Sequence, residues 1–201
     1  MQSKNASVKA MINKVSNELV AEAQAMLEAM SADYGHLKMS ELAVLVAYLR
    51  ALSTVHQTHH WQTRGGHYYG DHLLFERLYS NVSGEIDGVA EKAIGTGQHL
   101  LVQPIMQTAH LGQIMKCLYR DAPVDPDPQG YVALSLRAEL CFMVFLQLVY
   151  ARLQASGGLS LGIDNQLQGI ADKHEENLYL LRQRMGSRQA SGPKPDAWKA
   201  T

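Results

Sequence analysis

Four long segments with apolar residues at helical spacing, the first three each ended by a break with two glycines, constrain the fold of this chain more than any other feature. Ser40 is a suitable N-cap for the first segment, and Gly65-Gly66 ends it. Gly157-Gly158 separates the third segment from the fourth in the same way. We expect helices over residues 39–60, 72–94, 131–154 and 164–185. No segment has the two-residue period of a strand, so we predict an all-α protein.

The connection between the second and third expected helices is long and sets how the helices are arranged. Residues 98–116 have a less regular pattern, and the proline-rich segment 121–130 is a clear break. A long crossover at this position is typical of a ferritin-like four-helix bundle. An extra amphipathic helix is expected over residues 8–30. We divide the chain into an N-terminal basic segment with this helix (1–38), the bundle (39–185) and a flexible basic tail (186–201).

Composition excludes several classes of protein. The formal charge of −1 gives no overall basic field for nucleic acid, so any such affinity must come from locally basic segments. Cys117 and Cys141 are the two cysteines of the chain, and they have neither metal-binding spacing nor the density of a disulfide scaffold. The N-terminus has no apolar signal core, and the apolar stretch at residues 140–150 is too short for a bilayer. We therefore expect a cytoplasmic protein without a membrane partner.

Five potential metal ligands, His60, His72, Glu76, Asp87 and Glu91, lie between residues 60 and 91. The four on the second helix share one face, since each pair is spaced by one turn. At 1.5 Å per residue, however, His72 and Glu91 are about 28 Å apart, which no single metal bridges. One chain therefore supplies two half-sites, and two antiparallel copies across a two-fold axis would complete each site. The mixed imidazole and carboxylate set suits Fe(II) better than a structural zinc site.

A simpler interpretation is that these carboxylates form an ordinary solvated face of the helix, as most acidic pairs one turn apart do. Against it, the second helix already has an apolar face, which we assign to Leu73, Leu74, Leu78, Val82, Ile86, Val89 and Ala90. The carboxylates then need another reason for their alignment.

A specific motif runs through the same region: His60-Trp61, Gly65, His72, Glu76, Asp87, Ala90-Glu91-Lys92 and Gly95. On these residues the chain resembles the Dps family, the DNA-protection proteins of starved cells, which are dodecameric mini-ferritins. The resemblance extends over residues 40–185 by helix layout and over residues 56–95 by motif. Two departures are Glu76, where the family usually has Asp, and the poorly matched segment after residue 95. Asp164 and residues 170–175 resemble the family's last helix, in which His174 would be structural.

The resemblance implies a ferroxidase that binds two iron ions per site between subunits. His60, His72 and Glu76 would come from one subunit, and Asp87 and Glu91 from its two-fold partner. Trp61 would stand beside the iron, where it either passes electrons or fills space at the interface. Fe(II) would be oxidised by hydrogen peroxide or oxygen and stored as Fe(III) in a homo-oligomeric shell, a dodecamer in this family. Such a reaction limits oxidative damage to DNA.

Basic termini would supply the DNA contact in a protein of this kind, without reading bases. The cations concerned are Lys4, Lys9 and Lys14 at one end, and Arg182, Arg184, Arg188, Lys194 and Lys199 at the other. A purely solubilising role for these tails is an equal alternative. In a shell, weak contacts of many tails would add by avidity, and the protein would then associate with the bacterial nucleoid.

Other metal sites and another function remain as alternatives. A di-iron site within each bundle normally needs Glu-x-x-His, which the sequence lacks, although Glu41, Glu139, Glu175 and His174 offer another intra-subunit set. A non-enzymatic, DNA-compacting shell is a further alternative. His56 and His60, one turn apart, would also suit adventitious zinc.

Overall fold

A computed structural model describes residues 41–186, together with residues 21, 24 and 25. Its described part contains no strand, in agreement with an all-α protein. The helix predicted over residues 8–30 lies outside this part except for those three residues, and the tail lies outside it beyond residue 186. The helices are α2 (Glu41–Gln62), α3 (Tyr68–Gly95), α4 (Pro104–Leu118), α5 (Pro128–Ser156) and α6 (Leu161–Gly186).

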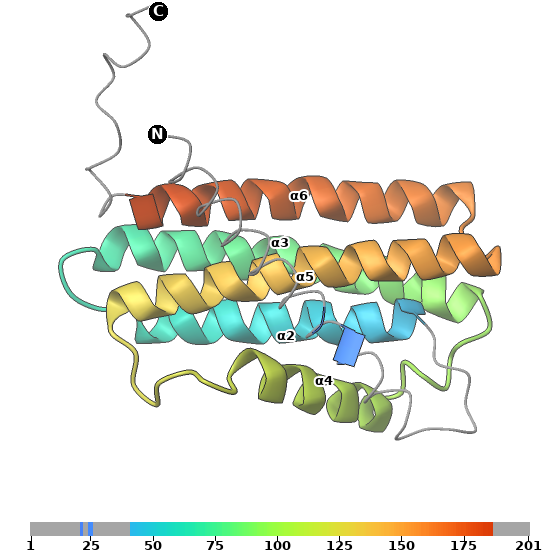
Figure 1. Cartoon of the computed structure of the whole chain (residues 1–201), viewed down its shortest axis with the longest axis horizontal. Helices are drawn as coiled ribbons and strands as arrows, with labels where there is room; N and C mark the ends of the chain where they lie inside the picture. The colour runs from blue at the N-terminus through green and yellow to red at the C-terminus, as the bar shows by residue number, and fades with distance from the viewer. Residues whose placement is uncertain (1–20, 22–23, 26–40, 187–201) are drawn as a thin grey trace, which may run out of the picture.

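The four long helices lie alongside one another, with the shorter α4 against α2 on the outside of the group (Figure 1). α2 and α3 form one antiparallel pair, and α5 and α6 form another. α3 ends at the opposite end of the molecule from the start of α5, so the connection has to run back along the helices, and α4 occupies that return path (Figure 1). The predicted long crossover between the second and third long helices is therefore present.

α2 is the central helix of this arrangement. It packs against α3, α4 and α5, and every residue from Leu42 to Leu49 is buried. A helix that is apolar on all sides is buried on all sides, and the sequence of α2 meets that requirement over these two turns. Tyr48 packs its ring against Phe142 and Phe145 of α5, with ring centroids 5.3 and 4.8 Å apart. The main core is therefore centred on α2.

The sequence did not predict α4 as a helix. Its buried positions are Gln107, His110, Ile114 and Leu118, which have helical spacing, but the first two are polar and dilute the apolar pattern. The side-chain nitrogen of Gln107 is satisfied because it donates to the carbonyl oxygens of Ala43 and Leu101, each at 3.0 Å. Pro104 at the first helical position is favourable, since its missing N–H is not needed there.

The second helix pair is closed by a short turn at Gly157. This residue has φ +72°, the left-handed conformation in which a side chain would be strained. The N–H of Gly158 donates to the carbonyl of Leu153 at 2.9 Å, and the hydroxyl of Ser160 accepts from the N–H of Ile163 at 3.3 Å. These bonds satisfy backbone groups at the end of α5 and at the start of α6.

α5 is long and apolar enough to cross a membrane, and within the described residues it is the one helix of which this is true. The sequence-based estimate was limited to residues 140–150, and the structure extends the apolar segment in both directions. Half of its most apolar window is buried inside the protein. Helices in the core of a soluble protein commonly meet the same criterion.

Candidate functional site

The turn between α2 and α3 brings two of the predicted ligands together. Gly65 adopts φ +83°, and its carbonyl accepts a hydrogen bond from the N–H of Tyr68 at 3.0 Å. This tight reversal places the last turn of α2 beside the first turns of α3. His60 and His72, twelve residues apart in sequence, therefore become neighbours, and their rings stack with centroids 3.7 Å apart.

The two imidazoles are fixed by reciprocal hydrogen bonds. Nδ1 of His60 lies 2.9 Å from the carbonyl oxygen of His72, and Nδ1 of His72 lies 3.1 Å from the carbonyl oxygen of His60. A carbonyl oxygen only accepts, so each Nδ1 must carry the hydrogen and donate it. In the neutral rings Nε2 then keeps its lone pair. An imidazole that donates one N–H to a carbonyl and offers the other nitrogen has the usual arrangement of a metal ligand.

The predicted carboxylates follow on the same helix. Glu76 is exposed one turn after His72, and Asp87 and Glu91 are exposed further along α3. In the described part of the chain, none of the three forms a hydrogen bond or an ion pair. α3 is continuous from Tyr68 to Gly95, so the separation of about 28 Å between residues 72 and 91 applies. A single chain thus brings His60 and His72 together, places Glu76 one turn further along α3 and leaves Asp87 and Glu91 apart.

Exposed apolar side chains surround this half-site and recur at the far end of α3. Trp61 is 68% exposed, Tyr69 74% and Leu73 44%. Ile94, near the end of α3, is 52% exposed. The prediction that Leu73 belongs to the core face is therefore wrong. The buried residues of α3 lie on a different stripe, formed by Asp71, Phe75, Leu78, Val82, Glu85, Val89 and Ala93.

A second set of functional side chains, which the sequence analysis largely missed, lies buried between the helices. His174 of α6 is fully buried, and its Nδ1 and Nε2 contact Glu139 of α5 and Glu85 of α3, the latter at 3.0 Å. The other oxygen of Glu139 lies 2.9 Å from Nε2 of His56, and it also accepts from the amide of Asn177 at 3.2 Å. Each of the four long helices contributes at least one side chain to this network.

Charge complementarity explains how the network tolerates burial. Burial alone would raise the pKa of Glu139, but the charge of His174 and hydrogen bonds from His174 and His56 lower it to about 2. Burial alone would lower the pKa of His174, but the charge of Glu139 and hydrogen bonds to Glu139 and Glu85 raise it to about 9. Glu139 and His174 therefore form an ion pair at neutral pH.

The network continues from His56 towards the crossover. The hydroxyl of Ser135 lies 3.1 Å from Nδ1 of His56 and 2.7 Å from Nδ1 of His59. Nε2 of His59 is 2.9 Å from the hydroxyl of Tyr119, which follows α4. Burial, followed by the charge of His56, lowers the pKa of His59 to about 3, so this ring is neutral. Burial raises the pKa of Tyr119 to about 12, so the phenol keeps its proton.

The buried network differs from the intra-subunit metal sites considered from the sequence. It contains Glu139 and His174, but Glu175 is exposed and Glu41 is at the start of α2. Both nitrogens of His174 and both oxygens of Glu139 are already used in hydrogen bonds. Among the residues that the structure describes, no group of three or more His, Cys, Asp or Glu side chains is arranged to hold a metal ion.

The His56–His60 pair suggested for zinc does not form either. His56 is fully buried and contacts Ser135 and Glu139, whereas His60 is half-buried and contacts His72. The two rings, one turn apart on α2, thus serve different environments.

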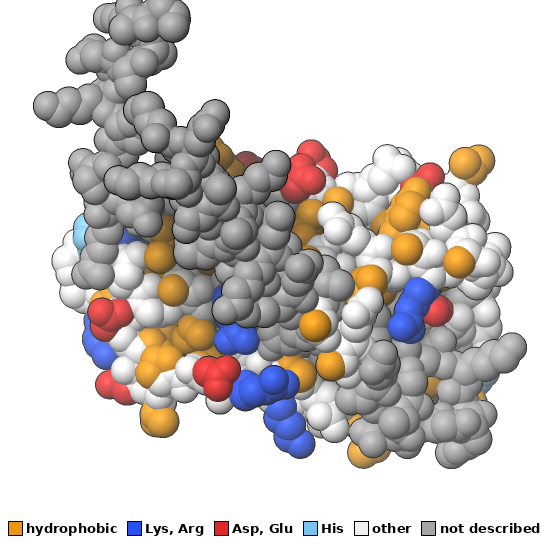
Figure 2. Space-filling model, in the orientation of Figure 1, with side chains coloured by type: hydrophobic (Ala, Val, Ile, Leu, Met, Phe, Trp, Pro, Cys, Tyr) orange, Lys and Arg blue, Asp and Glu red, His pale blue; other side chains and the backbone are white. Residues whose placement is uncertain are grey.

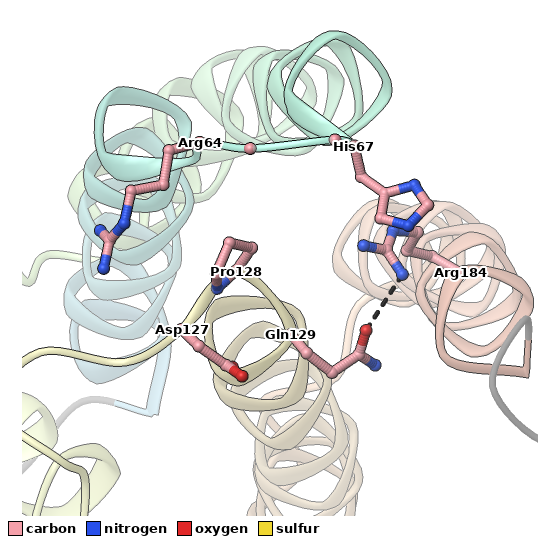
Figure 3. A pocket seen from close by; sticks show the side chains of 8 residues that line it. Arg64, His67, Asp127, Pro128, Gln129 and Arg184 are labelled. Carbon is pink, nitrogen blue, oxygen red and sulfur yellow. Dashed lines mark hydrogen bonds between the residues drawn. The ribbon is translucent and has the colours of Figure 1, made fainter.

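A polar pocket lies at the end of the molecule where α2 turns into α3, and Arg64 and Arg184 approach it from opposite sides (Figure 3). Arg184 donates to the buried carboxylate of Asp71 and to Gln129, the latter at 3.1 Å. Arg64 donates to Asp125 at 3.1 Å. Arg184 was predicted to be a cation of the tail, but it belongs to α6 and neutralises a buried acid. The pocket therefore carries no excess positive charge.

In the described part of the face seen in Figure 2, acidic and basic side chains alternate among apolar ones.

No family model matches this chain, and no curated protein matches it.

Proposed function

We propose that this chain is the subunit of a ferroxidase of the Dps type, in which iron binds between two copies of the chain. The observation that carries the proposal is the locked pair of imidazoles. His60 and His72 each donate Nδ1–H to the other's carbonyl, at 2.9 and 3.1 Å, and each retains Nε2 for a metal. Glu76, exposed in the next turn of α3, adds a carboxylate to this half-site.

The exposed stripe of α3 supports a two-fold arrangement. In an antiparallel pair of α3 helices, a contact between residue 72 and residue 91 of the partner also aligns residue 76 with residue 87. The same register aligns the exposed Tyr69 with the exposed Ile94 of the partner, so apolar surface becomes covered at both ends. Ser80 and Ser83, both exposed, meet at the centre, where small side chains permit close approach of the helices.

This register gives each interface two identical sites with complementary ligands. Asp87 and Glu91 have no partner among the residues that the structure describes, and His60, His72 and Glu76 lack the further oxygen ligands that iron takes. Two Fe(II) ions bound there would each give one electron to hydrogen peroxide, which takes up two protons and is reduced to two water molecules. Carboxylates stabilise the Fe(III) product because they match its higher charge.

Storage and DNA protection are further parts of the proposal. A closed homo-oligomer, a dodecamer if the chain follows the Dps pattern, would collect Fe(III) in its cavity. Oxygen would replace peroxide as a slower oxidant. The basic termini outside the described residues would hold the shell on DNA, although Arg184 no longer counts among those cations because Asp71 binds it. Deleting residues 1–17 and 187–201 and measuring gel retardation over a salt series would test that part separately.

Mixed assembly of two inactive variants tests the shared site. His72→Ala and Glu91→Ala should each abolish rapid Fe(II) oxidation by peroxide, because each removes a ligand from every site. In a mixed interface one site collects both defects and the other collects none. With random pairing, co-expression should therefore restore about a quarter of the wild-type sites.

Matched controls are available at exposed positions away from α3. His99→Ala and Glu175→Ala remove an exposed imidazole and an exposed carboxylate and should leave oxidation unchanged. Assembled, folded mixed shells with no activity above either parent would exclude a shared site. A wild-type shell that oxidises no iron faster than buffer would instead indicate a non-enzymatic shell.

A further inference from the structure

A continuous line of hydrogen bonds leads from Tyr119 into the centre of the protein. The phenol oxygen lies 2.9 Å from Nε2 of His59, and Nδ1 of the same ring lies 2.7 Å from the hydroxyl of Ser135. That hydroxyl lies 3.1 Å from Nδ1 of His56, whose Nε2 lies 2.9 Å from Glu139. Every link joins atoms that exchange protons readily.

The line has a consistent direction. The phenol of Tyr119 carries a hydrogen, and its 2.9 Å distance to Nε2 of His59 lets it donate there; Nδ1–H of the same ring then donates to the hydroxyl of Ser135. The hydroxyl of Ser135 then donates to Nδ1 of His56, and Nε2–H of His56 donates to the carboxylate of Glu139. If each of the first three hydrogens moves by one link, every bond is kept with donor and acceptor exchanged. The result is an imidazolium at His56 next to the carboxylate of Glu139.

The surroundings of this line of hydrogen bonds favour such a transfer of protons. His59, Ser135, His56 and Glu139 are at most 1% exposed, so bulk water does not interrupt the line. Aromatic rings enclose it: the His59 ring centroid lies 5.6 Å from that of Phe75 and 5.1 Å from that of Tyr131. A hydrogen-bonded line in a low-dielectric interior is strengthened by mutual polarisation.

The other end of the line opens to a surface pocket. Tyr119 is half-buried and lines a pocket of about 370 Å³ together with Met115, Pro126 and Tyr131. A small molecule in this pocket lies next to the phenol and to His59, which also lines the pocket although it is only 1% exposed, while Ser135, His56 and Glu139 stay inside. Electron and proton can therefore leave Tyr119 in different directions.

We propose that Tyr119 is a redox-active tyrosine that gives one electron to small one-electron oxidants in this pocket, with the His59–Ser135–His56 relay as its proton acceptor. The oxidants are hydroxyl radicals or similar products of peroxide reduction. The phenol O–H bond breaks, the electron reduces the oxidant, and the three hydrogens shift so that His56 gains a proton and Tyr119 becomes a neutral radical. This activity needs no bound iron and is independent of the shared metal site.

Flash photolysis with tris(bipyridine)ruthenium and a sacrificial acceptor tests the proposal on the assembled protein. The photogenerated Ru(III) takes one electron, and electron paramagnetic resonance detects the tyrosyl radical. Wild-type protein should give a radical whose main signal is lost in Tyr119→Phe. Tyr150→Phe is the matched control, since that phenol donates to Asp164 at 3.1 Å but has no internal relay. An unchanged signal in Tyr119→Phe would overturn the proposal.

Two further variants test the relay. His59→Gln retains a hydrogen-bond acceptor for Tyr119 but no proton acceptor, and it should slow radical formation about a hundredfold. Ser135→Ala keeps His59 and interrupts the next link, so it should slow the reaction by about tenfold or more, less than loss of the acceptor itself. If either variant fails to fold, the wild-type rate in mixtures of H₂O and D₂O still decides. A curved dependence on the deuterium fraction is expected for several moving protons, and a linear one would exclude the relay.

Discussion

Raising the pH through the pKa of His174 should remove a measurable part of the stability. The carboxylates around His174 raise its pKa from 6.5 to about 9 against the opposing effect of burial. A raised pKa in the folded state means that the stabilisation is complete below pH 6.5 and is lost as the pH rises through 9. A pKa difference of about 2.5 corresponds to about 3 kcal/mol of unfolding free energy, since each pKa unit is worth about 1.4 kcal/mol.

This pH window isolates His174 from the other buried groups. The pKa of Glu139 is lowered to about 2, so this carboxylate is ionised in both the folded and the unfolded chain between pH 6.5 and 9 and contributes no pH dependence there. The pKa of His59 is lowered to about 3, so this ring is neutral in the folded chain throughout the window. In the unfolded chain it is half protonated at pH 6.5, so it contributes only about 0.4 kcal/mol, with the opposite sign to His174.

Urea unfolding at several pH values between 6.5 and 9, at one protein concentration, gives the unfolding free energy. Wild-type protein should lose about 3 kcal/mol more over this range than His174→Gln, which cannot be protonated. His99→Gln replaces an exposed histidine and should retain the wild-type pH dependence. Equal pH slopes for the wild type and His174→Gln would refute the assignment of a protonated, paired His174.

Two other predictions concern the ends and the surface of the bundle. Arg184→Met leaves the buried carboxylate of Asp71 without its cation and should lower the free energy of unfolding in urea by about 3 to 5 kcal/mol. Arg77→Met removes the exposed pair with Glu176 and should lower it by about 1 kcal/mol or less. Equal losses for the two variants would contradict the argument from burial. Ser80→Arg places a long cation at the centre of the proposed α3–α3 contact and should shift the protein towards smaller species in size-exclusion chromatography. Its helix content, measured by circular dichroism, should be unchanged. An oligomer of unchanged size would exclude that contact.

The long helices were predictable because apolar periodicity is retained wherever core residues are apolar. The first predicted helix, residues 39–60, corresponds to α2 at Glu41–Gln62, and the third and fourth agree within three residues at each end. The second begins at Tyr68 rather than at residue 72, because its first turn is exposed and shows no apolar pattern. α4 was missed for a related reason: Gln107 and His110 occupy core positions, and their burial depends on hydrogen bonds that sequence spacing does not reveal.

The candidate sites also divide into a part that was predictable from the sequence and a part that was not. The motif predicted that His60 and His72 would meet, because a glycine turn and helix geometry are local properties. Asp71 and Glu85 were missed, although they share the spacing of Phe75, Leu78 and the other buried residues of α3. Polar residues in a core register are a usable signal, but their partners Arg184 and His174 lie about a hundred positions away in sequence, and single-sequence patterns carry no information on that pairing.

The buried network also has a consequence for how the chain assembles. α2 with α3 and α5 with α6 are two helical hairpins, each closed by a short turn, and α4 merely links them. His56, His59 and Glu85 come from the first hairpin, whereas Ser135, Glu139 and His174 come from the second. If the hairpins docked one turn out of register, by about 5.4 Å, Glu85 would be buried away from its cation His174, and Glu139 would lose the hydrogen bond from His56. Apolar surfaces alone would tolerate such a shift in register, so the buried polar network selects one alignment of the two hairpins.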